Sequence, residues 1–320
     1  MVTGKAFLNH LRNSNDLVTT YEATRAGFVS LALERNRRAT PTVVEARTLK
    51  EAASKAKNPA DLLKMNTIRS ALLTAAGVSD KAAGHMLTQD KEEAIQGLIK
   101  NFLEPSGIDF VEELVYRFLL TRGDSLGGSM RNVGGELAQQ KLTRTIIGTL
   151  SLAGKDVYWQ NSLNNSWALA KREDANIEHH TKGLSWMNEG SWRNLLFNRT
   201  IPIVGSNNID LILIKGDSRD ITSAIMQNPN RYVCLGELKG GIDPAGADEH
   251  WKTAKSALSR IRDSFSNKGY SPFLVFVGAA IEKKMAEEIW DDLEKGRLQN
   301  AANLTASPQI SSLCAWLCQL

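Results

Sequence analysis

Apolar residues recur three and four positions apart through most of residues 5 to about 120, which is the spacing of amphipathic helices. Two proline-containing triplets, Thr40-Pro-Thr and Asn58-Pro-Ala, interrupt this pattern and predict breaks between helices. Ser79-Asp-Lys and Thr88-Gln-Asp have the form of helix N-caps, in which a side-chain oxygen accepts from a free backbone N–H. The N-terminal part of the chain is therefore predicted to be all-helical.

The pattern changes after about residue 155, where β-branched and aromatic residues form short runs separated by turns. These runs predict strands at 183–187, 192–197, 208–214, 232–239 and 271–278, with helices at 249–265 and 284–293. Strands and helices in this order predict an α/β core whose mixed sheet is covered on its faces. We expect a helical region over residues 1–122 and an α/β core over residues 123–320.

A glycine-rich segment from Arg122 to Arg131 precedes a long amphipathic helix that is predicted at 133–153. The segment lacks the Gly-Lys-Ser/Thr ending of a loop that binds nucleoside triphosphates. We therefore expect a tight turn at this place and no nucleotide cofactor.

The charge distribution bears on the class of partner. The chain has 320 residues, 42% of them hydrophobic, and a formal net charge of +4, as in an ordinary globular protein. Residues 1–100 contain 15 Lys and Arg against 10 Asp and Glu, whereas residues 201–320 contain 13 against 14. This layout suits a protein in which one part binds a polyanion and another part holds a cation.

Cysteine usage and hydropathy bear on the compartment. Cys234, Cys314 and Cys318 lack the paired spacing of a zinc site, so we expect buried free thiols in a reducing compartment. No secretory leader follows Met1, and no stretch approaches the ~18–20 apolar residues of a membrane span. We expect a cytoplasmic protein without a membrane segment.

Two acidic residues stand in runs that are otherwise apolar. Asp210 lies in Asn208-Ile-Asp-Leu-Ile-Leu-Ile, and Glu237 and Lys239 end the run Tyr232-Val-Cys-Leu-Gly-Glu-Leu-Lys. Residues two apart on a strand share a face, so Glu237 and Lys239 point the same way. A carboxylate in a core is costly unless a cation compensates it. Two carboxylates that hold Mg²⁺, beside a lysine that orients water or stabilises charge on a phosphate, suit phosphodiester hydrolysis.

The same residues allow plainer interpretations. The Asp…Glu-x-Lys pattern of PD-(D/E)xK nucleases is short, and Glu282-Lys-Lys is a second Glu-x-Lys triplet, at a predicted helix start. Glu237 and Lys239 could form only a strand-end ion pair, worth roughly 0–1 kcal/mol if exposed. A non-catalytic DNA-binding protein stays open, as does a repair or junction-cleaving nuclease, which the large helical part disfavours. A small-molecule enzyme would require a nucleotide loop or a nucleophile site, and the sequence offers neither.

Longer segments resemble one family. The segment from Gly236 to Ala254, which begins Gly-Glu-Leu-Lys-Gly-Gly-Ile-Asp-Pro, is similar to the catalytic segment of the AvaI/BsoBI-type restriction endonucleases. Further segments that resemble this family are residues 16–25, 123–132, 137–144, 278–282 and 285–291. The resemblance covers nearly the whole chain and is weakest at about 155–200.

The resemblance implies a homodimeric type II restriction endonuclease that embraces double-stranded DNA and uses Mg²⁺. It implies cleavage of the degenerate palindrome C-Y-C-G-R-G after the first C, which leaves 5′ overhangs. Such a two-fold symmetric target matches a two-fold symmetric protein. Carried over by motif, Asp210 and Glu237 are metal ligands and Lys239 is the partner of water or phosphate.

Further roles are implied by position within the matching segments. His250 matches a family histidine near the attacking water, and its ordinary pKa suits a general base, although a helix-start histidine can also be structural. Asp243 could accept from a cytosine amino group, and Lys81 could donate to a purine, but residues of these types in loops are commonly solvated. Candidate phosphate contacts, each of which could equally be a solvated surface charge, are Arg35, Arg37, Arg38 and Lys141.

Overall fold

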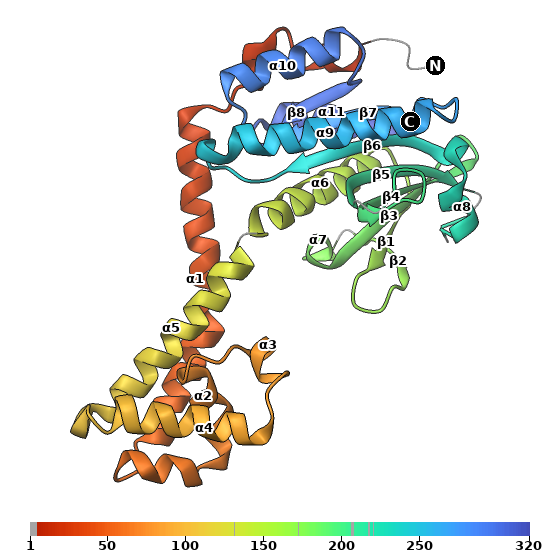
Figure 1. The fold of residues 1–320 in the computed structure, drawn as a ribbon. Coiled ribbons are helices and arrows are strands. Elements are labelled where there is room, and N and C mark those ends of the chain that lie inside the picture. The colour runs from red at the N-terminus through yellow and green to blue at the C-terminus, as the bar shows by residue number, and fades with distance from the viewer. Residues whose placement is uncertain (1–4, 131, 172, 206–207, 217, 220) are drawn as a thin grey trace. The chain divides into compact units, whose positions relative to one another are not determined.

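The computed structural model describes residues 5–130, 132–171, 173–205, 208–216, 218–219 and 221–320. Contacts between residues divide the chain into two compact units (Figure 1). The helical unit is Val29–Asn132, and the sheet unit combines Met1–Phe28 with Val133–Leu320. These two units are defined by packing. The boundary that the sequence predicts between residues 122 and 123 separates functional regions, and it stays a prediction.

The helical unit is built around one hydrophobic core. Its buried members include Leu49, Leu72, Ile95, Leu114 and Phe118, which lie on four different helices. Those helices are most of α1 (Tyr21–Ala53), α2 (Arg69–Ala75), α4 (Thr88–Leu98) and α5 (Phe110–Met130), and the short α3 (Asp80–Ala83) completes the set. Ser79 caps α3 by accepting from the backbone N–H of Ala82, as the sequence predicts.

The break expected at Thr40-Pro-Thr is wrong, because Pro41 lies inside α1. A proline removes one backbone hydrogen bond and costs about 3 kcal/mol within a helix. The preceding turn offsets part of this cost, since Glu34 accepts hydrogen bonds of 2.7 Å from both Arg37 and Arg38. The helix-forming pattern on both sides of Pro41 therefore outweighs one unfavourable residue.

The turn expected at 122–131 is also wrong over its described part, because α5 continues to Met130; Arg131 lies outside the described residues. Phe110, Leu114 and Phe118 anchor the first turns of this helix in the core. Each further residue then adds a backbone hydrogen bond to a helix that already exists, which is easier than starting one. This propagation carries the helix through glycines that disfavour it by about 1 kcal/mol each.

The sheet unit contains one eight-stranded mixed sheet in the order β2-β1-β3-β4-β5-β6-β7-β8. Neighbouring strands are antiparallel from β2 to β6 and parallel from β6 to β8. The strands are β1 (Val157–Asn161), β2 (Trp167–Leu169), β3 (Thr181–Asn188), β4 (Ser191–Thr200), β5 (Asn208–Gly216), β6 (Tyr232–Lys239), β7 (Phe273–Gly278) and β8 (Asn300–Asn303). The predicted α/β core with a mixed sheet is confirmed.

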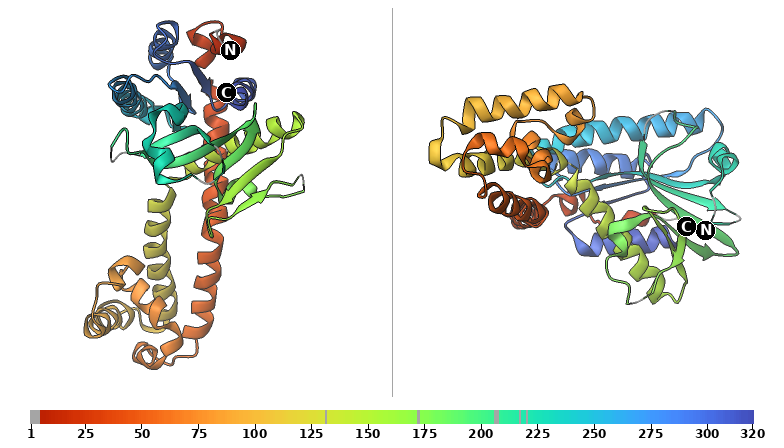
Figure 2. Two further views of the ribbon diagram at one scale, coloured as in Figure 1. Left: turned by 90° about the vertical axis from the view of Figure 1, so that its right-hand side faces the viewer. Right: turned by 90° about the horizontal axis from the view of Figure 1, so that it is seen from below.

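Helices cover both faces of this sheet (Figures 1 and 2). On one face lie α9 (Ala247–Ser266) and α10 (Lys283–Glu294), and on the other lie α6 (Val133–Leu152) and α11 (Ser307–Gln319). The short helices α7 (Ile177–His180) and α8 (Ser223–Gln227) occupy connections between strands. Among the described helices, none is long and apolar enough to cross a membrane.

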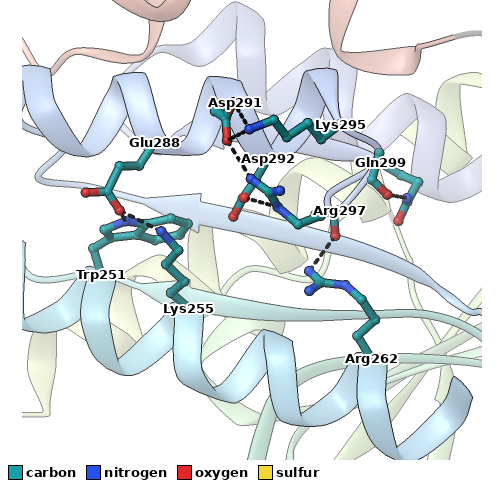
Figure 3. Close-up of polar contacts among 10 residues, drawn as sticks. Trp251, Lys255, Arg262, Glu288, Asp291, Asp292, Lys295, Arg297 and Gln299 are labelled. Carbon is teal, nitrogen blue, oxygen red and sulfur yellow. Dashed lines mark hydrogen bonds and ion pairs between the residues drawn. The ribbon is translucent and has the colours of Figure 1, made fainter. Parts of the chain in front are cut away.

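Polar contacts hold α9 to α10 (Figure 3). Glu288 of α10 accepts hydrogen bonds from Trp251 Nε1 at 2.9 Å and from Lys255 Nζ at 2.8 Å, both on α9. Further along α9, Arg262 donates to the backbone oxygen of Arg297 at 3.0 Å. These contacts join α9 to α10 and to the turn that follows α10.

Residues 5–20 belong to the sheet unit and not to the helical region in which the sequence pattern places them. They form two 3-10 turns, Ala6–Asn9 and Ser14–Leu17, instead of an amphipathic helix. Buried Asn303 donates from Nδ2 to Leu17 O at 2.8 Å, and Thr19 Oγ1 donates to Ala279 O at 2.7 Å. These contacts join residues 286 and 260 positions apart, which no local pattern encodes.

Candidate active site

The strand register brings the acidic residues together. Strands β5 and β6 are antiparallel with Leu211 opposite Gly236, so Asp210 and Glu237 come next to each other on adjacent strands. Side chains alternate between the faces of a sheet, which puts Lys239 on the same side as Glu237. Both strands are apolar in sequence because both faces of the sheet are covered. The three polar residues therefore stand where β5 begins and β6 ends.

Lys239 bridges the two carboxylates. Its Nζ lies 2.8 Å from Asp210 Oδ2 and 2.7 Å from Glu237 Oε2. Asp210 Oδ2 also accepts from the backbone N–H of Leu238 at 2.9 Å, which ties the two strands together beyond the last ladder pair. The structure thus brings together Asp210, Glu237 and Lys239, as their positions in the sequence predict.

Burial makes this cluster electrostatically unusual. Glu237 is only 4% exposed, and its Oε1 has no hydrogen-bond partner. Burial, and then the negative charge of Asp210, raise the pKa of Glu237 from 4.5 to about 7. Burial alone would lower the pKa of Lys239, but the two carboxylates outweigh it and raise that pKa. One lysine therefore does not fully compensate the two acids.

The residues present fit a hard divalent cation. Mg²⁺ prefers oxygen ligands and is commonly held by one or two carboxylates, with waters and substrate phosphate completing its shell. Asp210 and Glu237 supply two carboxylates, and the unpartnered Glu237 Oε1 is a buried acceptor without a donor. Among the described residues, no three His, Cys, Asp or Glu side chains gather as metal ligands.

The cluster opens into a pocket of about 550 Å³. One wall carries Asp210, Glu237 and Lys239 together with Asn208, which begins β5 two residues before Asp210. A second part of the lining is a face of α9 and is formed by Glu249, Lys252, Thr253, Ser256 and Arg260. Reasoning from the sequence did not single out these α9 residues, although their spacing of three and four predicts that they share a face.

His250 lies outside the residues that line this pocket. It is exposed in the first turn of α9, with its ring beside the loop that follows β6. A Cβ atom at Gly241 or Gly246 would lie 3.0 or 3.4 Å from His250 Nε2, so the glycines admit the ring close to the backbone. In the same loop, exposed Asp243 accepts from the backbone N–H of Ala245 at 3.0 Å and caps a 3-10 turn.

The remaining predicted contact residues have varied surroundings. In the helical unit, Lys81 is exposed on α3 and Arg35 is exposed on α1. Arg37 and Arg38 on α1 form ion pairs with Glu34. In the sheet unit, Lys141 Nζ donates to Leu304 O at 2.8 Å, and burial lowers its pKa.

The other sequence interpretations can be compared with the structure. The second Glu-x-Lys triplet lies where α10 begins, with Glu282 at the N-cap, and not on a strand. All three cysteines are free and buried, as expected.

An acid on one strand and a Glu-x-Lys triplet on its neighbour, in a mixed sheet covered by helices, define an α/β nuclease core. The model of the restriction endonuclease BsobI family matches residues 7–320. The type II restriction enzyme AvaI from Nostoc sp. is 57% identical over 311 residues, which is 97% of this chain and 98% of the relative; AvaI from Anabaena variabilis gives the same values. The type II restriction enzyme BsoBI from Geobacillus stearothermophilus is 52% identical over 321 residues, 99% of each chain. The chain belongs to the BsobI restriction endonuclease family, which confirms the resemblance seen in its sequence.

Proposed function

We propose that this restriction endonuclease is a Mg²⁺-dependent type II enzyme that hydrolyses double-stranded DNA at C-Y-C-G-R-G. It cuts after the first C and leaves 5′ overhangs. The chemistry is supported above all by the Lys239 bridge between buried Glu237 and partly buried Asp210 inside one pocket. The target sequence is supported by the family resemblance, which extends over the catalytic segment and the loop that follows it.

Each residue of the cluster has a chemical role in this proposal. Asp210 and Glu237 hold Mg²⁺, which when bound polarises the scissile phosphate and lowers the pKa of a coordinated water. Lys239, whose pKa is raised, keeps its proton at neutral pH and presents an ammonium to water or to a phosphate oxygen. Helix α9 covers part of the pocket, and Glu237 within it has little access to bulk solvent.

The roles of the other predicted residues are part of the proposal. Exposed His250 is proposed to act near the attacking water, as the family resemblance implies, and Asp243 and Lys81 are proposed to face bases. The proposed phosphate contacts are Arg35, Arg37, Arg38 and Lys141. Lys141 would have to give up its hydrogen bond to Leu304 O for such a contact, which makes it the weakest member of this set.

The proposed assembly is a homodimer that embraces DNA, with each subunit cutting one strand. A palindromic target supports this proposal, because a two-fold symmetric site presents the same surface to two identical subunits. The free thiols support a reducing compartment, and we propose the cytoplasm.

The test is digestion of mixed plasmid and genomic DNA with Mg²⁺ or with EDTA, followed by sequencing of the fragment ends. We expect discrete Mg²⁺-dependent ends at C-Y-C-G-R-G. Glu237→Ala should abolish cleavage and retain DNA binding, while Glu282→Ala, in the second Glu-x-Lys triplet, should cut normally. A smear, or cutting only at junctions, would refute the restriction activity at this site. Tight binding without cleavage by any divalent ion would indicate a non-catalytic protein.

A further inference from the structure

One face of α9 forms a wall of the pocket that holds the acidic cluster. Its pocket residues recur at Glu249, Thr253, Ser256 and Arg260, steps of three and four that keep them on one side of the helix. The opposite side is buried against the sheet through Trp251, Ala254, Leu258, Ile261 and Phe265. The direction of the pocket face is therefore fixed by core packing and does not depend on flexible contacts.

The two cations on this wall differ in their partners. Lys252 is exposed and forms an i,i+4 ion pair of 2.5 Å with Asp248. Arg260 forms no ion pair with any described residue, and its Nε is buried without a hydrogen-bond partner. By contrast Arg262, two residues further along the helix and on another side of it, donates to Arg297 O. Arg260 is thus the wall cation whose charge and buried donor are both left uncompensated.

An uncompensated guanidinium in a pocket has a defined chemical complement. Leaving a buried donor unpaired costs about 1–3 kcal/mol, more for a charged group, so such a group persists where a ligand satisfies it. The planar guanidinium presents paired N–H donors that match two phosphate oxygens. Thr253 and Ser256 add hydroxyl donors on the same wall, and neither adds negative charge.

We propose that Arg260 binds a backbone phosphate of the cleaved DNA strand and thereby seats that strand against Asp210, Glu237 and Lys239. The proposal rests on the proposed function, because it takes the acidic cluster as the place of hydrolysis. The bound group is a non-bridging phosphodiester pair of oxygens within two nucleotides of the scissile bond. Thr253 and Ser256 flank the same phosphate.

The experiment uses single-turnover cleavage of a C-Y-C-G-R-G duplex with Mg²⁺ at rising concentrations of the full-length protein. Arg260→Gln should raise the half-saturating concentration about tenfold, and the dependence of log affinity on log salt should fall by about 0.9, the value for one lost phosphate contact. Arg260→Lys retains the charge without the planar fork and should recover part of the loss. Lys268→Gln is the matched control, since it removes one exposed charge just beyond α9 and away from the pocket.

A phosphate scan distinguishes direct contact from a structural effect. Duplexes that carry one uncharged methylphosphonate, placed in turn around the cut, are tested with the wild type and with both Arg260 variants. At one linkage the neutral phosphate should raise the half-saturating concentration of the wild type by the same factor as the Arg260→Gln substitution does. At that linkage it should not raise the half-saturating concentration of Arg260→Gln any further. If the two losses multiply at every linkage, or if Arg260→Gln behaves like Lys268→Gln, the proposal is overturned. If Arg260→Gln does not fold, as shown by tryptophan fluorescence, the same comparison with Arg260→Lys decides. Absence of Mg²⁺-dependent cleavage by both the wild type and Lys268→Gln would overturn the proposed function as well.

Discussion

Glu237 should destabilise the metal-free protein at neutral and higher pH, so Glu237→Gln should stabilise it there. The carboxyl is 4% exposed and lies beside Asp210, and its Oε1 has no hydrogen-bond donor. Burial first and Asp210 second raise its pKa from 4.5 to about 7. A neutral amide of the same shape removes the charge that the folded protein accommodates poorly, and Lys239 retains Asp210 as a partner at 2.8 Å.

The sign and size follow from proton linkage. The unfolded chain releases the proton of Glu237 near pH 4.5, whereas the folded protein keeps it until about pH 7. Between these values the folded state binds more protons, so stability falls as the pH rises through this window. The rise from 4.5 to about 7 corresponds to about 3 kcal/mol. Glu237→Gln should gain about this amount at pH 8 and almost nothing at pH 4.5.

Urea unfolding in EDTA, followed by tryptophan fluorescence at pH 8 and pH 5, measures this difference. All seven tryptophans lie beyond residue 132, so the signal reports on the sheet unit alone. Adding Mg²⁺ should stabilise the wild type at pH 8 and have little effect on Glu237→Gln, because the cation compensates the charge that the amide lacks.

Glu288→Gln is the control of opposite sign. Hydrogen bonds from Lys255 and then Trp251 lower the pKa of Glu288, so this carboxylate stabilises the protein above its ordinary pKa. Its replacement should destabilise the protein at pH 8. Equal or lower stability of Glu237→Gln than of the wild type at pH 8 in EDTA would refute the reasoning.

Two further predictions concern the scaffold. A Cβ at Gly240 would lie 1.9 Å from Gly134 O, so Gly240→Ala should destabilise the sheet unit by about 1–3 kcal/mol and slow cleavage. The control is Gly148→Ala, which has open space at its Cβ and should be neutral or stabilising by up to about 1 kcal/mol. Asn303→Ala removes the donor to Leu17 O and should lower stability by about 2–3 kcal/mol, with unchanged cleavage at low temperature. Urea midpoints and initial cleavage rates test both, and an unchanged midpoint for either destabilising variant would contradict its packing argument.

The acidic cluster could be predicted because its signal is local. Asp210 interrupts an apolar run, and Glu237 and Lys239 stand two apart at the end of another, so strand periodicity alone places Glu237 and Lys239 on one face. Their meeting with Asp210 requires that β5 and β6 be antiparallel neighbours with Leu211 opposite Gly236. The family resemblance supplied that pairing indirectly, since the motif is defined by such a pair of strands.

Elements that depend on distant contacts could not be predicted. Strand β8 has the sequence Asn-Ala-Ala-Asn, which has no strand propensity, and it exists because β7 offers a parallel edge and because Asn303 bonds residues of the N-terminal segment. The local pattern of residues 5–20 carries no trace of those contacts and therefore predicts a helix there. Pro41 shows the converse case, in which a strong local signal for a break is outweighed by the helix on either side.

Two groups of opposite charge, each with one buried polar atom that lacks a hydrogen-bond partner in the described part of the chain, share one pocket without pairing with each other. Glu237 Oε1 and Arg260 Nε are both buried and both lack a hydrogen-bond partner among the described residues. A protein selected only for stability would bring such groups together or replace them, since each costs free energy when left alone. They lie on different elements instead: the sheet register fixes Glu237 on β6, and the buried face of α9 fixes Arg260. A pocket that keeps an acceptor for a cation and a donor for an anion apart is suited to a ligand that brings both charges. A phosphodiester with its divalent counter-ion brings both charges. Binding of this ligand explains both the stability cost at Glu237 and the unpaired guanidinium of Arg260.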